Sequence, residues 1–94
     1  EGLEKSLLWQ LESAERLVDL EFVITSAYRE GDPKCHGQGQ AVDIRCDEAW
    51  HRYKIVRGLI QAGFRRIGIY DKHVHADTCT HGFPQGVIWM GESR

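Results

Sequence analysis

Residues 64–77 read FRRIGIYDKHVHAD and predict two β-strands, over 64–70 and 72–77, joined closely enough to form a hairpin. Successive side chains of a strand point to opposite faces of the sheet, so every second residue shares a face. The titratable residues that would share one face of this hairpin are Asp71, His73, His75 and Asp77.

The rest of the chain predicts two helices and three further strands. Apolar residues recur at helical spacing over 3–18 and 48–62, with Asp47 as the expected N-cap and Gly63 as the left-handed stop of the second helix. Further strands are expected over 21–27, 40–46 and 87–90. The sequence therefore predicts an α+β fold in which two helices pack on one small, mostly antiparallel β-sheet.

Length and composition limit the protein to one small domain, which we expect to span residues 1–94. The chain carries 12 Lys and Arg against 14 Asp and Glu, a net charge of −2, which argues against a nucleic-acid partner held by phosphate neutralisation. Its apolar runs are far shorter than the roughly 20 residues needed to cross a bilayer, so we expect no membrane span.

Three cysteines, Cys35, Cys46 and Cys79, stand at irregular spacing. This number and spacing exclude a dense disulfide framework. They leave open one bridge with a free thiol, or three buried thiols.

The predicted strand face that carries Asp71, His73, His75 and Asp77 needs hydrogen-bonding partners, water or a bound ion. Burying such a face without compensation costs several kcal/mol, so it must meet water or converge on something that satisfies it, and a metal ion does so. His36 lies on a glycine-rich loop and Asp43 lies in mid-strand. With His75 they form a set of two histidines and one carboxylate, which leaves the fourth position of a catalytic zinc site open for water. Taken singly, His36 is more simply a surface histidine and Asp43 an edge-strand acid.

Three motifs resemble a known peptidase family. HGQGQAVD at residues 36–43 resembles the HxxGxAxD signature of the M15 zinc peptidases, the group of D-Ala-D-Ala carboxypeptidases and phage endolysins. HVH at 73–75 resembles the HxH signature of the wider group that includes lysostaphin-type enzymes and the hedgehog signalling domain, and SAYR at 26–29 resembles the family's S-x-Y-R segment. The motifs stand in the family's order along the chain.

The resemblance implies that His36, Asp43 and His75 bind zinc (Zn2+) and that Arg29 stabilises the oxyanion of the substrate. The alternative that His73 is the zinc ligand in place of His75 stays open, because spacing alone does not distinguish the two histidines of the HVH motif.

The catalytic base is a separate question. Lys72 stands where family members with an acidic base carry Glu or Asp, and lysine is a poor base at neutral pH. His73 is therefore the expected base or transition-state hydrogen-bond donor, as in enzymes of the HxH type, and Asp71 is the second candidate.

The function that this resemblance implies is hydrolysis of an amide bond in the peptide stem of bacterial peptidoglycan, by a carboxypeptidase or an endolysin-like endopeptidase. We expect a monomer acting at the bacterial cell wall, whether periplasmic, secreted or delivered by a phage. One alternative is a metal-containing binding module of the same fold without catalysis. Another is a structural zinc site formed by the residues Cys35, Cys46, Cys79 and His81.

Overall fold

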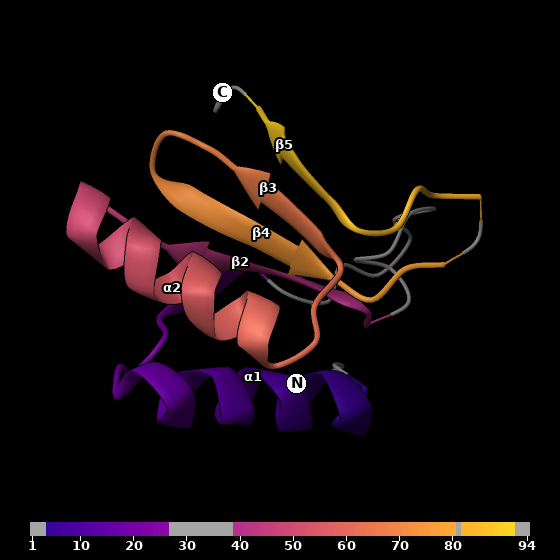
Figure 1. The fold of residues 1–94 in the computed structure, drawn as a ribbon, viewed down its shortest axis with the longest axis horizontal. Coiled ribbons are helices and arrows are strands. Elements are labelled where there is room, and N and C mark those ends of the chain that lie inside the picture. Colours follow the sequence, from indigo (N-terminus) through magenta and orange to yellow (C-terminus); the bar gives the residue numbers. More distant parts are fainter. Residues whose placement is uncertain (1–3, 27–38, 81, 92–94) are drawn as a thin grey trace.

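The computed structural model describes residues 4–26, 39–80 and 82–91. Two helices and five strands follow one another along these residues (Figure 1). In chain order they are α1 (Lys5–Val18), β1 (Ile24–Ser26), β2 (Ala41–Arg45), α2 (Ala49–Gln61), β3 (Arg66–Ile69), β4 (His73–Asp77) and β5 (Val87–Met90). The α+β prediction of two helices on one small sheet is confirmed.

The strands form a single mixed sheet in the order β1-β2-β4-β3-β5. β2 pairs with β1 and β4, and β4 pairs with β3, all in antiparallel fashion, which is the predicted character of the sheet. β5 differs, because it runs parallel to β3. The chain leaves β4 at the end of the sheet where β3 begins, so β5 starts there and follows the direction of β3.

Both helices pack on one face of the sheet, where they form the hydrophobic core (Figure 1). The alternation of β2, β3 and β4 sends apolar side chains such as Val42, Ile67 and Val74 to this face. The buried residues that meet there include Val42, Ile44, Val74 and Ala76 from the sheet and Leu7, Leu11, Ile55 and Leu59 from the helices. The polar residues of the same strands therefore point to the opposite face, which neither helix covers.

The ends of α2 follow the sequence in part. Gly63 ends the helix as predicted, because its φ of +99° is a conformation that other residues rarely adopt. The prediction that Asp47 caps the helix is wrong. Glu48 holds the N-cap position without a side-chain cap hydrogen bond, and the Asp47 carboxylate instead accepts a hydrogen bond of 3.1 Å from Arg45 Nε.

In the part of the chain that the structure describes, no helix is long and apolar enough to cross a membrane.

Candidate functional site

Strand register lines up four residues in one row across the sheet. Asp43 on β2 pairs with His75 on β4, His75 pairs with Gly68 on β3, and Gly68 pairs with Trp89 on β5. This row lies on the face away from the helices, because the residues next to Asp43, His75 and Gly68 in β2, β4 and β3 point into the core. Gly68 has no side chain, and the Trp89 indole lies across it, with its ring centroid 5.4 Å from that of His75.

Two carboxylates hold the His75 imidazole, one at each ring nitrogen. Nδ1 lies 3.2 Å from Asp43 Oδ1, and Nε2 lies 2.6 Å from Asp77 Oδ2. Burial alone would lower the pKa of His75, but the hydrogen bonds to Asp43 and Asp77, together with their negative charges, raise the pKa above its ordinary value. The Asp43 and Asp77 carboxylates are both satisfied when each ring nitrogen of His75 carries a proton. A metal ion can also take the place of one of these protons.

Asp77 is the most deeply buried acid of the cluster, with only 2% of its surface exposed. Its Oδ1 accepts hydrogen bonds from Arg66 Nε at 2.7 Å and from the backbone N–H of Cys79 at 3.1 Å. Burial would raise the pKa of this carboxyl, but the contacts with His75, Cys79 and Arg66 lower the pKa below its ordinary value. Asp77 is therefore held as a carboxylate next to His75.

His73 lies beside the same cluster. Its Nε2 is 3.8 Å from Asp43 Oδ1, beyond direct hydrogen bonding, and a quarter of its side chain is exposed. Its ring stacks on Tyr70, with the centroids 4.4 Å apart and the planes 10° from parallel. Stacking on Tyr70 restricts the orientation of the ring, and the ring stays partly accessible to solvent.

Asp71 is not part of the strand face on which it was expected. It lies in the exposed turn before β4 begins at His73, so it does not continue the alternation of that strand. Its backbone carbonyl accepts a hydrogen bond of 3.3 Å from Arg52. Arg29 and His36, the other predicted site residues, lie outside the described residues.

The sequence interpretation missed Arg66, whose guanidinium contacts the buried Asp77. Arg66 is itself buried, with 8% of its surface exposed, which is unusual for arginine unless it is paired. The sequence predicted the hairpin, but the register that places Arg66 of β3 directly opposite Asp77 of β4 comes from the structure.

The described part of the cluster fits two ligands of a zinc ion. Zinc bonds to nitrogen and oxygen at about 2.0–2.2 Å in a tetrahedral arrangement, which separates two ligand atoms by about 3.3 Å. The 3.2 Å between His75 Nδ1 and Asp43 Oδ1 agrees with this separation. The Asp77 carboxylate at Nε2 is the kind of partner that a zinc-bound histidine ordinarily has.

Among residues 4–26, 39–80 and 82–91, no group of three or more His, Cys, Asp or Glu side chains is placed to hold a metal ion by itself. Asp43 and His75 would therefore need a ligand from elsewhere in the chain, and His36 is the one that the sequence predicts.

Of the two cysteine arrangements that the sequence left open, the structure shows one disulfide bridge together with a free thiol. Cys79 is disulfide-bonded, whereas Cys46 is a free thiol in the core. A disulfide sulfur is not a thiolate ligand. The alternative of a structural zinc site that uses Cys79 is therefore inconsistent with the structure.

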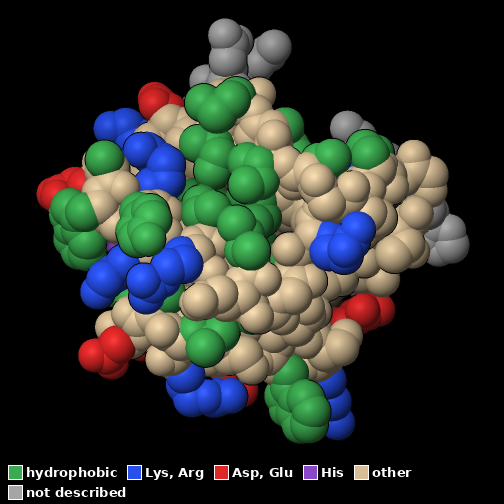
Figure 2. All heavy atoms as spheres, viewed as in Figure 1, with side chains coloured by type: hydrophobic (Ala, Val, Ile, Leu, Met, Phe, Trp, Pro, Cys, Tyr) green, Lys and Arg blue, Asp and Glu red, His purple; other side chains and the backbone are tan. Residues whose placement is uncertain are grey.

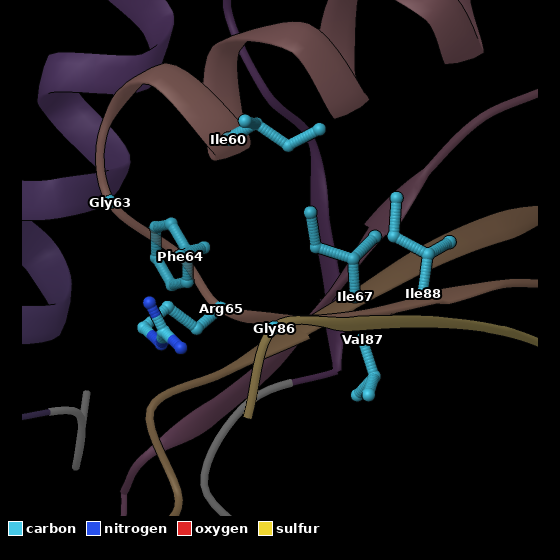
Figure 3. Close-up of a pocket in the computed structure, with 8 residues that line it drawn as sticks. All are labelled: Ile60, Gly63, Phe64, Arg65, Ile67, Gly86, Val87 and Ile88. Atoms are coloured by element: carbon cyan, nitrogen blue, oxygen red, sulfur yellow. The ribbon is translucent and has the colours of Figure 1, made fainter. Parts of the chain in front are cut away.

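An apolar hollow of about 420 Å³ lies away from this cluster, between the end of α2 and strands β3 and β5 (Figure 3). The side chains of Ile60, Ile67 and Ile88 point into the same space. Hydrophobic side chains also gather on the surface of the molecule viewed in Figure 2, and Ile60, Ile88 and Met90 are among the exposed apolar residues. None of the described residues that line the hollow is a histidine or an acid, so it is separate from the described part of the candidate site.

Comparison of the chain with protein-family models, with curated proteins and with solved structures finds no match in any of the three.

Proposed function

We propose that this protein is a zinc peptidase with the fold of the D-Ala-D-Ala peptidase and hedgehog group, and that it hydrolyses an amide bond in the peptide stem of bacterial peptidoglycan. The observation that carries the proposal is the placement of His75 between Asp43 and Asp77 on the face of the sheet away from the two helices. A partly buried histidine with a carboxylate at each nitrogen suits a metal ligand with its supporting partner. The three motifs of the sequence add the resemblance to this peptidase family.

In the proposed site, Asp43, His75 and His36 hold the zinc ion. Zinc bound there would polarise the scissile carbonyl and lower the pKa of bound water to about 7. Asp77 accepts the N–H of His75 at Nε2, which fixes the ring with Nδ1 toward Asp43. The nearer approach of His75 to Asp43, 3.2 Å against 3.8 Å for His73, favours His75 as the ligand.

His73 is the proposed base. Its ring is partly exposed, lies close to Asp43 and is held by Tyr70, so it can accept a proton at the site without moving far. Asp71 is the less favoured candidate, because it lies in the exposed turn that precedes β4. Arg29 takes the role that the resemblance implies, stabilising negative charge on the substrate oxygen.

The shape of the described site supports a polymeric peptide as the substrate. Neither α1 nor α2 covers the face that carries Asp43 and His75 (Figure 1). An extended, flexible stem peptide can lie across such a face, whereas a small metabolite needs an enclosed pocket to bury most of its surface.

The first experiment measures bound zinc in purified wild-type protein and in the variants His36→Ala, Asp43→Ala and His75→Ala. We expect one zinc per chain in the wild type and loss of zinc in each variant. Asp47→Ala is the matched control, because Asp47 is exposed and contacts Arg45 rather than the cluster. Full zinc retention in all three site variants would overturn the ligand assignment.

The second experiment tests catalysis. Zinc-loaded protein is incubated with purified peptidoglycan of several stem chemistries, and released stem fragments are identified by mass spectrometry. We expect cleavage by the wild type and none by Asp43→Ala. Stoichiometric zinc without cleavage of any peptidoglycan would contradict the peptidase proposal.

The alternative is a binding module that keeps the metal and has no catalytic role. Lys72 at the position of the family's acidic base is the observation that favours it. His73→Ala separates the two functions. A peptidase loses its cleavage rate while keeping zinc, whereas a binding module keeps its retention on peptidoglycan in a pelleting assay.

A further inference from the structure

We propose that Arg66 is a positioning residue of the metal centre, which acts through Asp77 to hold His75 in its metal-binding orientation. This inference rests on the proposed function, because it assumes that His75 binds the metal. It adds a residue that none of the three sequence motifs contains.

The contacts of Asp77 divide between its two oxygens. Oδ2 meets His75 Nε2 at 2.6 Å, and Oδ1 meets Arg66 Nε at 2.7 Å. The backbone N–H of Cys79 reaches Oδ1 as well, at 3.1 Å. The plane of the carboxylate, and with it the direction of the bond to His75, is therefore set by the groups at Oδ1.

Arg66 is itself held on several sides. Its Nη1 donates a hydrogen bond of 2.7 Å to the Pro84 carbonyl oxygen. The guanidinium carbon lies 4.8 Å from the centroid of the Phe83 ring and 4.9 Å from that of Trp89, within the range of cation–π attraction. A side chain fixed in this way presents Nε to Asp77 in one direction only.

A charged pair with so little exposure has consequences when one partner is removed. The Arg66 and Asp77 side chains are 10% and 2% exposed, so water does not replace the lost contact. Without the guanidinium, the Asp77 carboxylate loses both its neutralising charge and one of its two contacts at Oδ1. It then orients His75 less firmly. Metal binding must therefore also order the imidazole ring, which lowers the affinity for the metal.

The experiment measures zinc affinity by competition with a chromophoric chelator, together with the melting temperature of the metal-free protein. The variants are Arg66→Met, which keeps an unbranched apolar stem and loses the guanidinium charge, and Arg66→Lys, which keeps the charge and loses the forked geometry. The matched control is Arg65→Met. Arg65 is the neighbouring residue in the chain, is exposed, and lines the apolar hollow.

We expect Arg66→Met to weaken zinc binding about 10-fold or more, as is typical of residues that support metal ligands. Arg66→Lys is expected to recover part of this loss, and Arg65→Met to bind zinc as the wild type does. If Arg66→Met does not fold, the comparison rests on Arg66→Lys, for which we expect at least a threefold loss. Wild-type affinity in a folded Arg66→Met or Arg66→Lys variant would overturn the proposal.

A double-mutant cycle tests the route through Asp77. Asp77→Asn alone should also weaken zinc binding, and adding Arg66→Met to it should have little further effect. Fully additive losses would show that Arg66 does not act through Asp77. Wild-type protein that binds no zinc would overturn the metal centre and this inference together, whereas normal wild-type binding with unaffected Arg66 variants would overturn this inference alone.

Discussion

At the scale of single residues, Gly68 allows the row formed by Asp43, His75, Gly68 and Trp89 to assemble, because it leaves space for the Trp89 indole. A Cβ atom at this position would lie 2.6 Å from Trp89 Cε2, closer than packed atoms approach. The indole would have to leave the surface of β3, and its contact with His75 would go with it. The absence of one methyl group therefore allows the aromatic wall of the site to form.

We predict that Gly68→Ala lowers the free energy of unfolding by about 1–3 kcal/mol, the usual cost of overpacking. Urea denaturation followed by circular dichroism measures the loss. In a Trp89→Ala background the same substitution has space, and its cost should largely disappear. An equal loss in both backgrounds would show that Trp89 is not the obstacle.

Cys46 is a second residue with a clear expectation. Its side chain is buried, and burial raises the pKa of the thiol above its ordinary value, although the Arg52 charge and the Glu48 carbonyl act in the opposite direction. The raised pKa stabilises the fold below about pH 8.5, the ordinary value of an unfolded thiol. That contribution is lost as the pH rises through the folded pKa.

We therefore predict that iodoacetamide labels Cys46 slowly in the native protein at pH 8 and rapidly once urea unfolds the chain. Peptide mapping by mass spectrometry measures the modification at this residue. Cys46→Ser provides the peptide standard without a reactive group at that site. Equal labelling rates of folded and unfolded protein would contradict a buried, protonated thiol.

Part of the candidate site could be predicted at this scale, because alternation along β4 places His73, His75 and Asp77 on one face without knowledge of the fold. The role of Arg66 could not be predicted in the same way, because it depends on which residue of β3 lies opposite Asp77. The shared face was extended wrongly to Asp71, because strand periodicity does not reveal where the turn ends.

At the scale of elements, the two helices approach each other at Gly58 of α2. A Cβ atom there would lie 2.8 Å from the Ala14 carbonyl oxygen and 3.2 Å from Val18 Cγ1 of α1. Glycine is normally unfavourable in a helix by about 1 kcal/mol relative to alanine. Here the close packing of α1 against α2 opposes that preference.

We predict that Gly58→Ala destabilises the protein by about 1–2 kcal/mol, although it improves helix propensity. Gln61→Ala, an exposed substitution in the same helix, should change stability by less than about 0.5 kcal/mol. Both are measured by urea denaturation. A gain in stability from Gly58→Ala would show that the helices can move apart without cost.

Helix and strand positions were largely predictable, because α1, α2 and β2–β5 follow the apolar periods of the sequence. Over 21–27, where a longer strand was expected, the structure describes β1 as Ile24–Ser26, and its register with β2 shifts within those residues. The parallel direction of β5 could not be predicted from its sequence, because periodicity shows which face a residue takes and not the direction of the strand.

At the scale of the whole molecule, the proposed zinc ion would connect β2 with β4 through Asp43 and His75. A ligand that binds only the folded state stabilises it, by about 2.7 kcal/mol at a free concentration 100 times its dissociation constant. For a chain of this size, each kcal/mol shifts the melting temperature by roughly 4–8 °C.

We therefore predict that saturating zinc raises the melting temperature by roughly 10–20 °C and that a chelator reverses the shift. Thermal unfolding followed by circular dichroism measures both. Asp43→Asn is the matched variant, since it keeps the size of the side chain and removes the charge, and it should show little response to zinc. Identical melting curves of wild-type protein with and without zinc would contradict a metal that binds the folded state.

The sequence separation of the cluster also bears on how the protein is made. Asp43 and His75 stand 32 positions apart in the chain, and a ribosome adding about 5–20 residues per second needs roughly 2–6 s to pass from one to the other. During that interval the nascent chain contains Asp43 but not His75, so the site cannot form before β4 has been synthesised. Loading of the proposed zinc ion would therefore follow the synthesis of β4.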